Sequence, residues 1–257
     1  MIEIKNIYKS FGNKKVLSGV NMTIPKGDTY CVIGKSGSGK SVLLKIMIGI
    51  LKPDKGDIIF DGLDIHQLDK KQSFEVRKKI GFVFQGAALF DSMTVFENTI
   101  ISMYEHGIRD INTLEKEAIR VLSAVSLLPE MDQRNSDYFL KEWEMLKNKK
   151  PSDLSGGMRK RVGVARALVG KPEYIFYDEP TTGLDPVTSE QIDNMIAELA
   201  KKLKVTSVVI THDMFSVYRI ADNISLLHNG KVYFSGNVEK LKNSNDNIVK
   251  EFIKRFS

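Results

Sequence analysis

Eight consecutive residues have the types and spacing of a loop that binds phosphate groups. They read GKSGSGKS and fit the pattern G-x-x-x-x-G-K-[ST]. Glycines at positions 37 and 39 let the backbone curl, so that several N–H groups point toward a phosphate chain. Lys40 would then reach the β- and γ-phosphates, and the Ser41 hydroxyl would bind Mg²⁺. The residues expected to bind the nucleotide are Gly34, Lys35, Ser36, Gly37, Ser38, Gly39, Lys40 and Ser41.

The alternative to a nucleotide site at this loop is a solvated glycine turn. The flanking sequence argues against it, because a strand-like run (28–33, DTYCVI) precedes the loop and an apolar, helix-like run (42–51, VLLKIMIGIL) follows it. A helix that begins near Lys40 adds the partial positive charge of its N-terminus. The sequence therefore predicts a nucleoside triphosphate as the ligand.

Two acids and a histidine follow strand-like runs and could carry out hydrolysis. The run EYIFYD ends at Asp178, Glu179 comes next, and the β-branched run VTSVVIT ends just before His212. Asp178 fits a carboxylate near Mg²⁺, and Glu179 fits a base for the attacking water. His212 could hydrogen-bond the γ-phosphate or that water. The other histidines have no such context and are interpreted as surface or loop residues: His66, His106 and His228.

Two isolated residues could face the same ligand. Gln85 follows the strand-like run IGFVF, and a polar residue at the carboxyl end of a strand in an α/β sheet is well placed for this. Phe11 either packs in the core or presents its ring to a nucleobase. The apolar segment after Gln85, AALFDSMTVFEN, either faces a partner or packs on its own domain before a helix begins.

A second anion site is predicted where the run LSGGMRKR opens a helix. Ser155, Gly156 and Gly157 leave the first N–H groups of that helix unobstructed and add a hydroxyl. Because the chain has a single phosphate loop, this second site is predicted to serve a nucleotide held by another copy.

The elements that must position these residues alternate as in an α/β fold. The alternating run from Ile2 to Pro25, with Gly12-Asn13 between its halves, predicts an antiparallel hairpin that leads into the central sheet. A strand is expected within 53–62, helices within 112–147, and a stop and cap for the next helix at 151–153. Residues 189–203 predict a helix, and residues 224–236 a hairpin that turns at Asn229-Gly230. A basic, amphipathic tail spans 238–257.

The composition is that of a globular protein with one large core. The chain has 257 residues, of which 42% are hydrophobic and 27% charged. It shows no apolar run of about 18 residues and no signal-peptide pattern at its N-terminus. The net charge of +6 suits anionic lipid or nucleic acid, but scattered surface lysines explain it equally well. Cys31 is the single cysteine, so no disulfide can form within the chain. Cys31 and Trp143 are expected in the core.

The order Phe11, GKSGSGKS, Gln85, LSGGM, IFYDEP, GLD and His212 resembles the nucleotide-binding domain of ABC transporters along the whole chain. The resemblance implies a P-loop NTPase with a RecA-like core, an antiparallel β subdomain and a helical subdomain at about 91–165. The domain would span 1–240 and the tail 241–257. It further implies that ATP is hydrolysed with Mg²⁺ bound at Ser41, Gln85 and Asp178.

The same resemblance assigns a role to each remaining position. Phe11 stacks on the base, Gln85 also couples to a permease, and Asp178 and Glu179 form the acidic pair. Glu179, His212 and Gln85 are the catalytic residues by this resemblance. The signature residues acting in trans and the acid of the D-loop are Ser155, Gly156, Gly157 and Asp185.

Two stretches, FQGAALFDSMTVFEN and LSGGMRKRVGVARAL, look like the ATPases of Mla/Mce-type phospholipid transporters. This narrower resemblance implies a homodimer on the cytoplasmic face of the inner membrane, bound peripherally to two permease copies. An Mce-domain lipid-binding protein would join through the permease, and in some systems a STAS-domain protein joins as well. The segment 128–150 is longer than the segment that usually precedes PSDLSGG in this family, so the chain departs from the family pattern there.

Three other functions compete with lipid transport. The same ATPase could serve an importer of amino acids or other small solutes, but the runs after Gln85 favour the lipid family. A soluble ABC protein that acts on nucleic acid usually carries two such domains or a long coiled-coil insertion, and this chain has neither. A regulatory module without turnover is disfavoured because Glu179 and His212 are both present. We therefore expect no nucleic-acid partner.

Overall fold

A six-stranded sheet runs through the centre of the computed structural model, which describes residues 1–256. Its order is β10-β9-β3-β8-β7-β6, and all neighbours are parallel except β10, which pairs antiparallel with β9. Because parallel strands end at the same edge of a sheet, the segments that follow β3, β6, β7 and β8 meet there. The strands are β3 (Thr29–Ile33), β6 (Ile80–Val83), β7 (Tyr174–Asp178), β8 (Thr206–Thr211), β9 (Asn223–His228) and β10 (Lys231–Gly236).

A second sheet contains four antiparallel strands in the order β2-β1-β4-β5. The predicted N-terminal hairpin is confirmed, but it belongs to this smaller sheet, and only the segment after it enters the central one. The predicted C-terminal hairpin turns at Asn229 and Gly230, whose φ angles of 48° and 71° suit a tight two-residue turn. The strands of the smaller sheet are β1 (Ile2–Phe11), β2 (Lys14–Ile24), β4 (Lys55–Phe60) and β5 (Leu63–Asp64).

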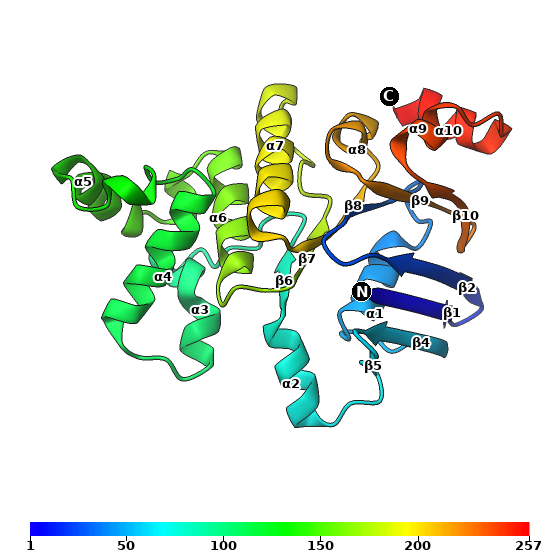
Figure 1. Ribbon diagram of the computed structural model, residues 1–257, viewed down its shortest axis with the longest axis horizontal. Coiled ribbons are helices and arrows are strands. Elements are labelled where there is room, and N and C mark those ends of the chain that lie inside the picture. Colours follow the sequence, from blue (N-terminus) through cyan, green and yellow to red (C-terminus); the bar gives the residue numbers. More distant parts are fainter. Residues whose placement is uncertain (257) are drawn as a thin grey trace.

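The helices flank the two sheets, and α3, α4 and α5 gather at the end of the molecule farthest from β1, β2 and β4 (Figure 1). None of the described helices is long and apolar enough to cross a membrane. The helices are α1 (Lys40–Met47), α2 (Lys70–Lys78), α3 (Val95–Glu105), α4 (Ile111–Ala124), α5 (Asp137–Lys147), α6 (Gly156–Leu168), α7 (Pro186–Leu203), α8 (Met214–Ile220), α9 (Val238–Lys242) and α10 (Asn247–Phe256), with 3₁₀ turns η1 (Met131–Gln133) and η2 (Pro151–Asp153).

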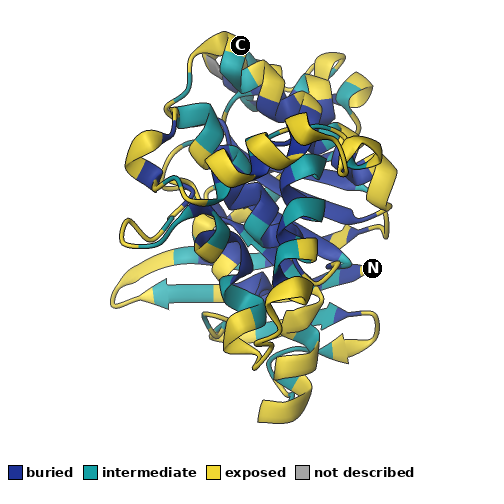
Figure 2. Ribbon diagram, turned by 90° about the vertical axis from the view of Figure 1, so that its left-hand side faces the viewer, coloured by how far each residue is buried: buried dark blue, intermediate teal, exposed yellow. Residues whose placement is uncertain are grey.

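Strands β3, β7 and β8 are buried along nearly their whole length, so the sheet carries a core on either side. Along β3, Tyr30 and Val32 point into one cluster, whereas Cys31 and Ile33 point into the other. Figure 2 shows the buried residues concentrated in these strands and the exposed ones on the outer helices. Cys31 is fully buried, as predicted, and burial raises the pKa of its thiol far above the usual range.

Two predicted helix boundaries are wrong, each for a local reason. Helix α1 ends at Met47 rather than near residue 51, because Gly49 follows with a φ of 73°. Residues 151–153 were expected to cap the next helix, but they form η2. The Ser155 Oγ caps α6 instead, accepting a hydrogen bond from Met158 N at 3.2 Å.

Candidate active site

The loop between β3 and α1 has the backbone that the glycine spacing predicts. Gly37 and Gly39 have φ angles of 77° and 103°, which side chains disfavour. A Cβ on Gly39 would lie 2.8 Å from Leu17 Cδ2, so a larger residue would push the loop away from β2. The Ser38 Oγ is buried without a hydrogen-bond partner in the described part of the chain. A polar loop with an unused hydroxyl fits a phosphate ligand.

Lys40 at the start of α1 is held inside this loop. Its side chain is 7% exposed, and its Nζ donates to the carbonyl oxygens of Gly34 at 2.7 Å and Lys35 at 3.3 Å. The Nζ also lies 3.9 Å from Glu179 Oε1. Burial lowers the pKa of Lys40, while the carboxylates of Glu179 and Asp178 oppose that shift. The carbonyl oxygens of the loop thus hold the ammonium inside the loop.

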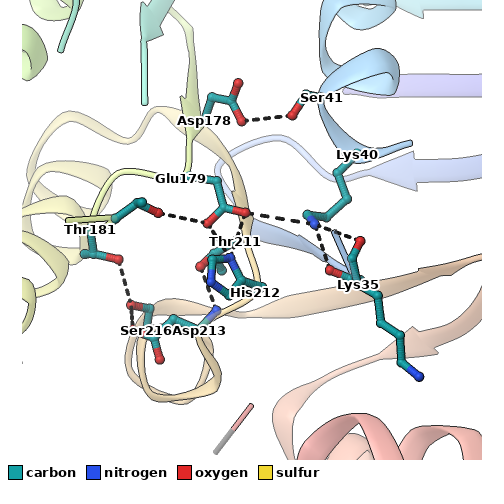
Figure 3. A network of polar contacts seen from close by, with 12 residues as sticks. Lys35, Lys40, Ser41, Asp178, Glu179, Thr181, Thr211, His212, Asp213 and Ser216 are labelled. Atoms are coloured by element: carbon teal, nitrogen blue, oxygen red, sulfur yellow. Dashed lines mark hydrogen bonds and ion pairs between the residues drawn. The ribbon is translucent and has the colours of Figure 1, made fainter. Parts of the chain in front are cut away.

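Glu179 stands between this lysine and His212 (Figure 3). The His212 Nδ1 lies 2.8 Å from Glu179 Oε2 and 3.0 Å from Oε1, an arrangement that fixes the carboxylate on the imidazole side. Glu179 has a φ of 50°, a left-handed conformation rare outside glycine, and its N–H donates to Ile210 O at 2.8 Å. The carboxylate is nearly buried, at 12% exposure.

Asp178, at the end of β7, faces the hydroxyl at the start of α1. The Ser41 Oγ donates to Asp178 Oδ1 at 3.4 Å. Burial and then the nearby Glu179 carboxylate raise the pKa of Asp178, and the Ser41 hydrogen bond opposes them. The described residues hold no group of three or more histidine, cysteine or acidic side chains that could bind a metal alone. The hydroxyl and carboxylate oxygens fit Mg²⁺, which takes its remaining ligands from water and substrate phosphate.

Two hollows meet at this cluster. The first, of about 790 Å³, is lined by the phosphate loop together with Phe11, Gln85, Glu179 and His212. Phe11 is 50% exposed there, so its ring is presented to the cavity rather than packed in the core. The second hollow, of about 780 Å³, shares Glu179 and His212 and continues along residues 181–190. Most of the residues that the sequence predicted for the site therefore come together in a single chain.

The predicted signature and D-loop residues do not line the first hollow: Ser155, Gly156, Gly157 and Asp185. Ser155 caps α6. The Asp185 carboxylate caps α7, accepting hydrogen bonds from Thr188 N at 3.0 Å and Thr188 Oγ1 at 2.5 Å. Both side chains are exposed on the surface.

Two basic residues near the site escaped the sequence analysis. Lys160 on α6 is 6% exposed, and its Nζ donates to the Gln85 carbonyl oxygen. Burial lowers the pKa of Lys160, and the Glu179 carboxylate opposes the shift. Arg255 on α10 lines both hollows. The run MRKR and the basic tail each contain several basic residues. No periodicity in the sequence indicates which of these residues faces the site.

Asn98 organises the segment after Gln85, whose role the sequence left open. Its side-chain amide donates to the carbonyl oxygens of Phe90, Met93 and Thr94, and its Oδ1 accepts from Phe90 N at 2.8 Å. Asn98 is fully buried, whereas Phe90 is 50% exposed. The segment is thus shaped from within its own domain and still presents an aromatic ring outward.

Residues 17–182 match the family described as ABC transporter. The chain belongs to this family. Among solved structures, a dimeric post-hydrolysis state of the ATP-binding cassette MJ0796, bound to ADP and Pi, is similar with a TM-score of 0.78. The two are 32% identical over 93% of this chain and 99% of that chain. The fold is the α/β P-loop fold of such cassettes, and the chain carries the ATPase domain of an ABC transporter.

Curated relatives of the ABC family differ in the transport that their names describe. The probable ribonucleotide transport ATP-binding protein mkl of Mycobacterium tuberculosis is 35% identical over 98% of this chain, which spans 66% of mkl. The intermembrane phospholipid transport ATP-binding protein MlaF of Haemophilus influenzae is 35% identical, over 99% of this chain and 90% of MlaF. The methionine import ATP-binding protein MetN of Carboxydothermus hydrogenoformans is 36% identical, over 98% and 71%.

Proposed function

We propose that two copies of this chain hydrolyse ATP between them and so power phospholipid transport by an Mla/Mce-type transporter. The observation that carries the catalytic part is the Lys40–Glu179–His212 cluster beside the phosphate loop. The lipid part is supported by the similarity to MlaF and by the residues that follow Gln85.

In this proposal the chain's own groups bind ATP and prepare the water. The loop N–H groups and Lys40 hold the phosphates, and the Phe11 ring stacks on the base. The oxygen of the water attacks the γ-phosphorus in line, and ADP leaves. Glu179 accepts the proton that the water loses in this step. His212 holds the Glu179 carboxylate and contacts the γ-phosphate or the water.

Mg²⁺ would be held by Ser41, Asp178 and Gln85. Ser41 and Gln85 line the cavity of the phosphate loop, and Asp178 adjoins it through its contact with Ser41. When bound, the ion neutralises the charge that builds on the phosphates. The 3.4 Å contact between Ser41 Oγ and Asp178 Oδ1 supports this assignment, because it shows two of these groups already oriented together.

The second copy would complete each site in this proposal. Ser155, Gly156 and Gly157 do not line the chain's own cavity. They lie at the start of α6, where Ser155 is exposed and the two glycines are half-buried. A head-to-tail partner would bring them, with its Asp185, against the nucleotide. The dimeric MJ0796 structures support the pairing of two copies.

The partners in this proposal are those of an Mla/Mce system. Two permease copies would seat the dimer on the cytoplasmic face of the inner membrane. An Mce-domain protein would bind lipid beyond the permease, and a STAS-domain protein is a further partner to look for. The exposed Phe90, held outward by the Asn98 loop, is consistent with a surface that meets another subunit.

A second candidate is an importer of amino acids or other small solutes, because MetN is as similar to this chain as MlaF is. The same ATPase site serves either function. The difference lies in subunits that recognise the cargo.

Purification of the assembly from native membranes distinguishes these two functions. The chain is isolated in mild detergent, and co-purifying proteins and small molecules are identified by mass spectrometry. A permease together with an Mce-domain protein and phospholipid is the expected result. A permease with a solute-binding protein and no lipid would overturn the lipid proposal and leave the ATPase site intact.

A further inference from the structure

The C-terminal helix α10 is packed firmly beside the nucleotide cavity. Val249 and Phe252 are 1% and 2% exposed and belong to the main core cluster. The start of the helix is fixed by Asp246, whose carboxylate accepts hydrogen bonds from Ile248 N at 2.8 Å and from Tyr233 OH at 2.8 Å. Side chains on the far end of α10 therefore project from a fixed support.

One face of α10 is turned toward the phosphate loop. The Lys35 Nζ lies 3.1 Å from Glu251 Oε1, and in Figure 3 the Lys35 side chain extends away from Lys40 toward the C-terminal segment. Glu251 is 68% exposed, so this ion pair adds little to stability, but it shows which face of α10 is turned toward Lys35. Residues four apart share a helix face, so Arg255 lies on the same side as Glu251.

Arg255 lies near Glu179 and His212. It lines the hollow of the phosphate loop and also the adjoining one, and both hollows contain Glu179 and His212. In the first hollow it joins three other cations: Lys14, Lys35 and Lys40. A guanidinium presents paired N–H donors that match phosphate oxygens.

We propose that Arg255 binds the terminal phosphate of the nucleotide held by its own chain. This inference rests on the proposed nucleotide site. Arg255 lies outside residues 17–182, the part of the chain that matches the family. The proposed phosphate contact therefore comes from the C-terminal helix of this chain. α10 thereby becomes part of the nucleotide site, and its Glu251–Lys35 ion pair aligns the guanidinium.

The test compares binding of AMP-PNP and ADP, both with Mg²⁺, to the full chain by titration calorimetry. Variants are Arg255→Ala, Arg255→Lys, Lys40→Ala and the control Lys254→Ala. Lys254 is exposed on the same turn and lines neither hollow. Arg255→Ala should weaken AMP-PNP about tenfold and ADP much less, since a charged hydrogen bond to the terminal phosphate is lost. Arg255→Lys should recover part of the affinity, and Lys254→Ala should bind as the unmodified chain does.

Three results would overturn the assignment of Arg255. These are unchanged AMP-PNP affinity in Arg255→Ala, an equal loss for AMP-PNP and ADP, or an equal loss in Lys254→Ala. Lys40→Ala separates this inference from the site on which it rests. If Lys40→Ala weakens both nucleotides while Arg255→Ala changes neither, only the role of Arg255 fails. If Lys40→Ala also binds normally, the nucleotide site itself is wrong.

Discussion

At the scale of single residues, Glu179 is held in place by its backbone and its neighbours together. Its left-handed φ of 50° costs free energy, and the hydrogen bond from its N–H to Ile210 O helps to maintain it. The side chain then meets an ammonium on one side and an imidazole on the other. Such a fixed acceptor needs little reorganisation when water must be activated.

Glu179→Gln should abolish most turnover while leaving ATP binding intact. The amide has nearly the same shape but cannot take the proton from water, so hydrolysis should fall about 10²–10⁴-fold. An ATP-bound dimer should accumulate, visible by light scattering after gel filtration. The matched control is Glu190→Gln, an exposed acid of the second hollow. Normal hydrolysis by Glu179→Gln would remove Glu179 from its proposed role.

Lys160 carries a residue-scale prediction that the sequence alone did not suggest. Its buried ammonium binds the Gln85 carbonyl oxygen and so ties α6 to the segment after β6. Methionine at position 160 has a side chain of similar length to lysine and removes a desolvated charge. The free energy of unfolding should therefore change by less than about 1 kcal/mol in Lys160→Met. Turnover should fall several-fold because Gln85 loses its anchor.

The test of Lys160 is a pair of measurements, thermal unfolding and steady-state ATP hydrolysis, on Lys160→Met and Lys160→Arg. Arginine retains a donor for the carbonyl and should restore most of the rate. If both variants hydrolyse ATP like the unmodified chain, Lys160 does not position the loop.

At the scale of elements, a buried ion pair joins α7 to α8. Asp193 is fully buried, and its Oδ2 accepts from Arg219 Nη1 at 3.0 Å. Burial raises the pKa of Asp193 to about 6, while Arg219 opposes this shift and Asp213 adds to it. Helix α8 begins two residues after His212, so the ion pair that holds α8 against α7 also helps to fix the position of His212.

The sign of the pH effect follows from that raised pKa. An unfolded aspartate titrates near about 3.9, so between that value and about 6 the folded state binds more protons. The Asp193 contribution to stability is therefore largest at low pH and is lost as pH rises through 6. Relative to Asp193→Asn, the unmodified chain should lose up to about 3 kcal/mol between pH 4 and pH 7. Urea unfolding of both proteins at several pH values measures this, and a pH-independent difference would refute it.

The central strands were predictable from sequence, whereas the ends of two helices were not. Runs such as TYCVI and TSVVIT are rich in apolar and β-branched residues and so are identified as strands without tertiary information. Because parallel strands share an edge, the meeting of Gln85, Asp178 and His212 with the phosphate loop followed as well. The exact cap of α6 depends on which of several polar residues before it adopts the extended conformation, and no periodicity encodes that choice.

At the scale of the whole molecule, the signature residues separate from the cavity they are proposed to complete. The positions of Arg255 and Lys160 could not be predicted for a related reason, since each depends on how a distant helix packs. Local sequence gives the type of such a side chain but not its neighbours. Whole-molecule geometry is what gathers cations from residues 14, 35, 40 and 255 around one hollow.

Ser155→Asp should prevent ATP-driven dimerisation without unfolding α6. Aspartate is a good N-cap, so the bond now made to Met158 N is retained. The added carboxylate would repel a phosphate held by the second copy. We expect unchanged thermal stability and ATP binding but no dimer by light scattering with ATP.

The matched control for this variant is Ser136→Asp, the same change at the exposed N-cap of α5, where the serine accepts from Phe139 N at 3.1 Å. It should dimerise normally. A Ser155→Asp protein that still dimerises with ATP would place the signature residues outside the interface.

The buried thiol in β3 makes the chain a convenient subject for spectroscopy. Cys31 is the single cysteine, and it is inaccessible and kept protonated by its surroundings. A cysteine introduced at the exposed Val187 or Lys254 would thus be the one site that a maleimide dye or spin label modifies in the folded protein. Distances between two labelled copies could then be followed through a turnover cycle without first removing any native residue.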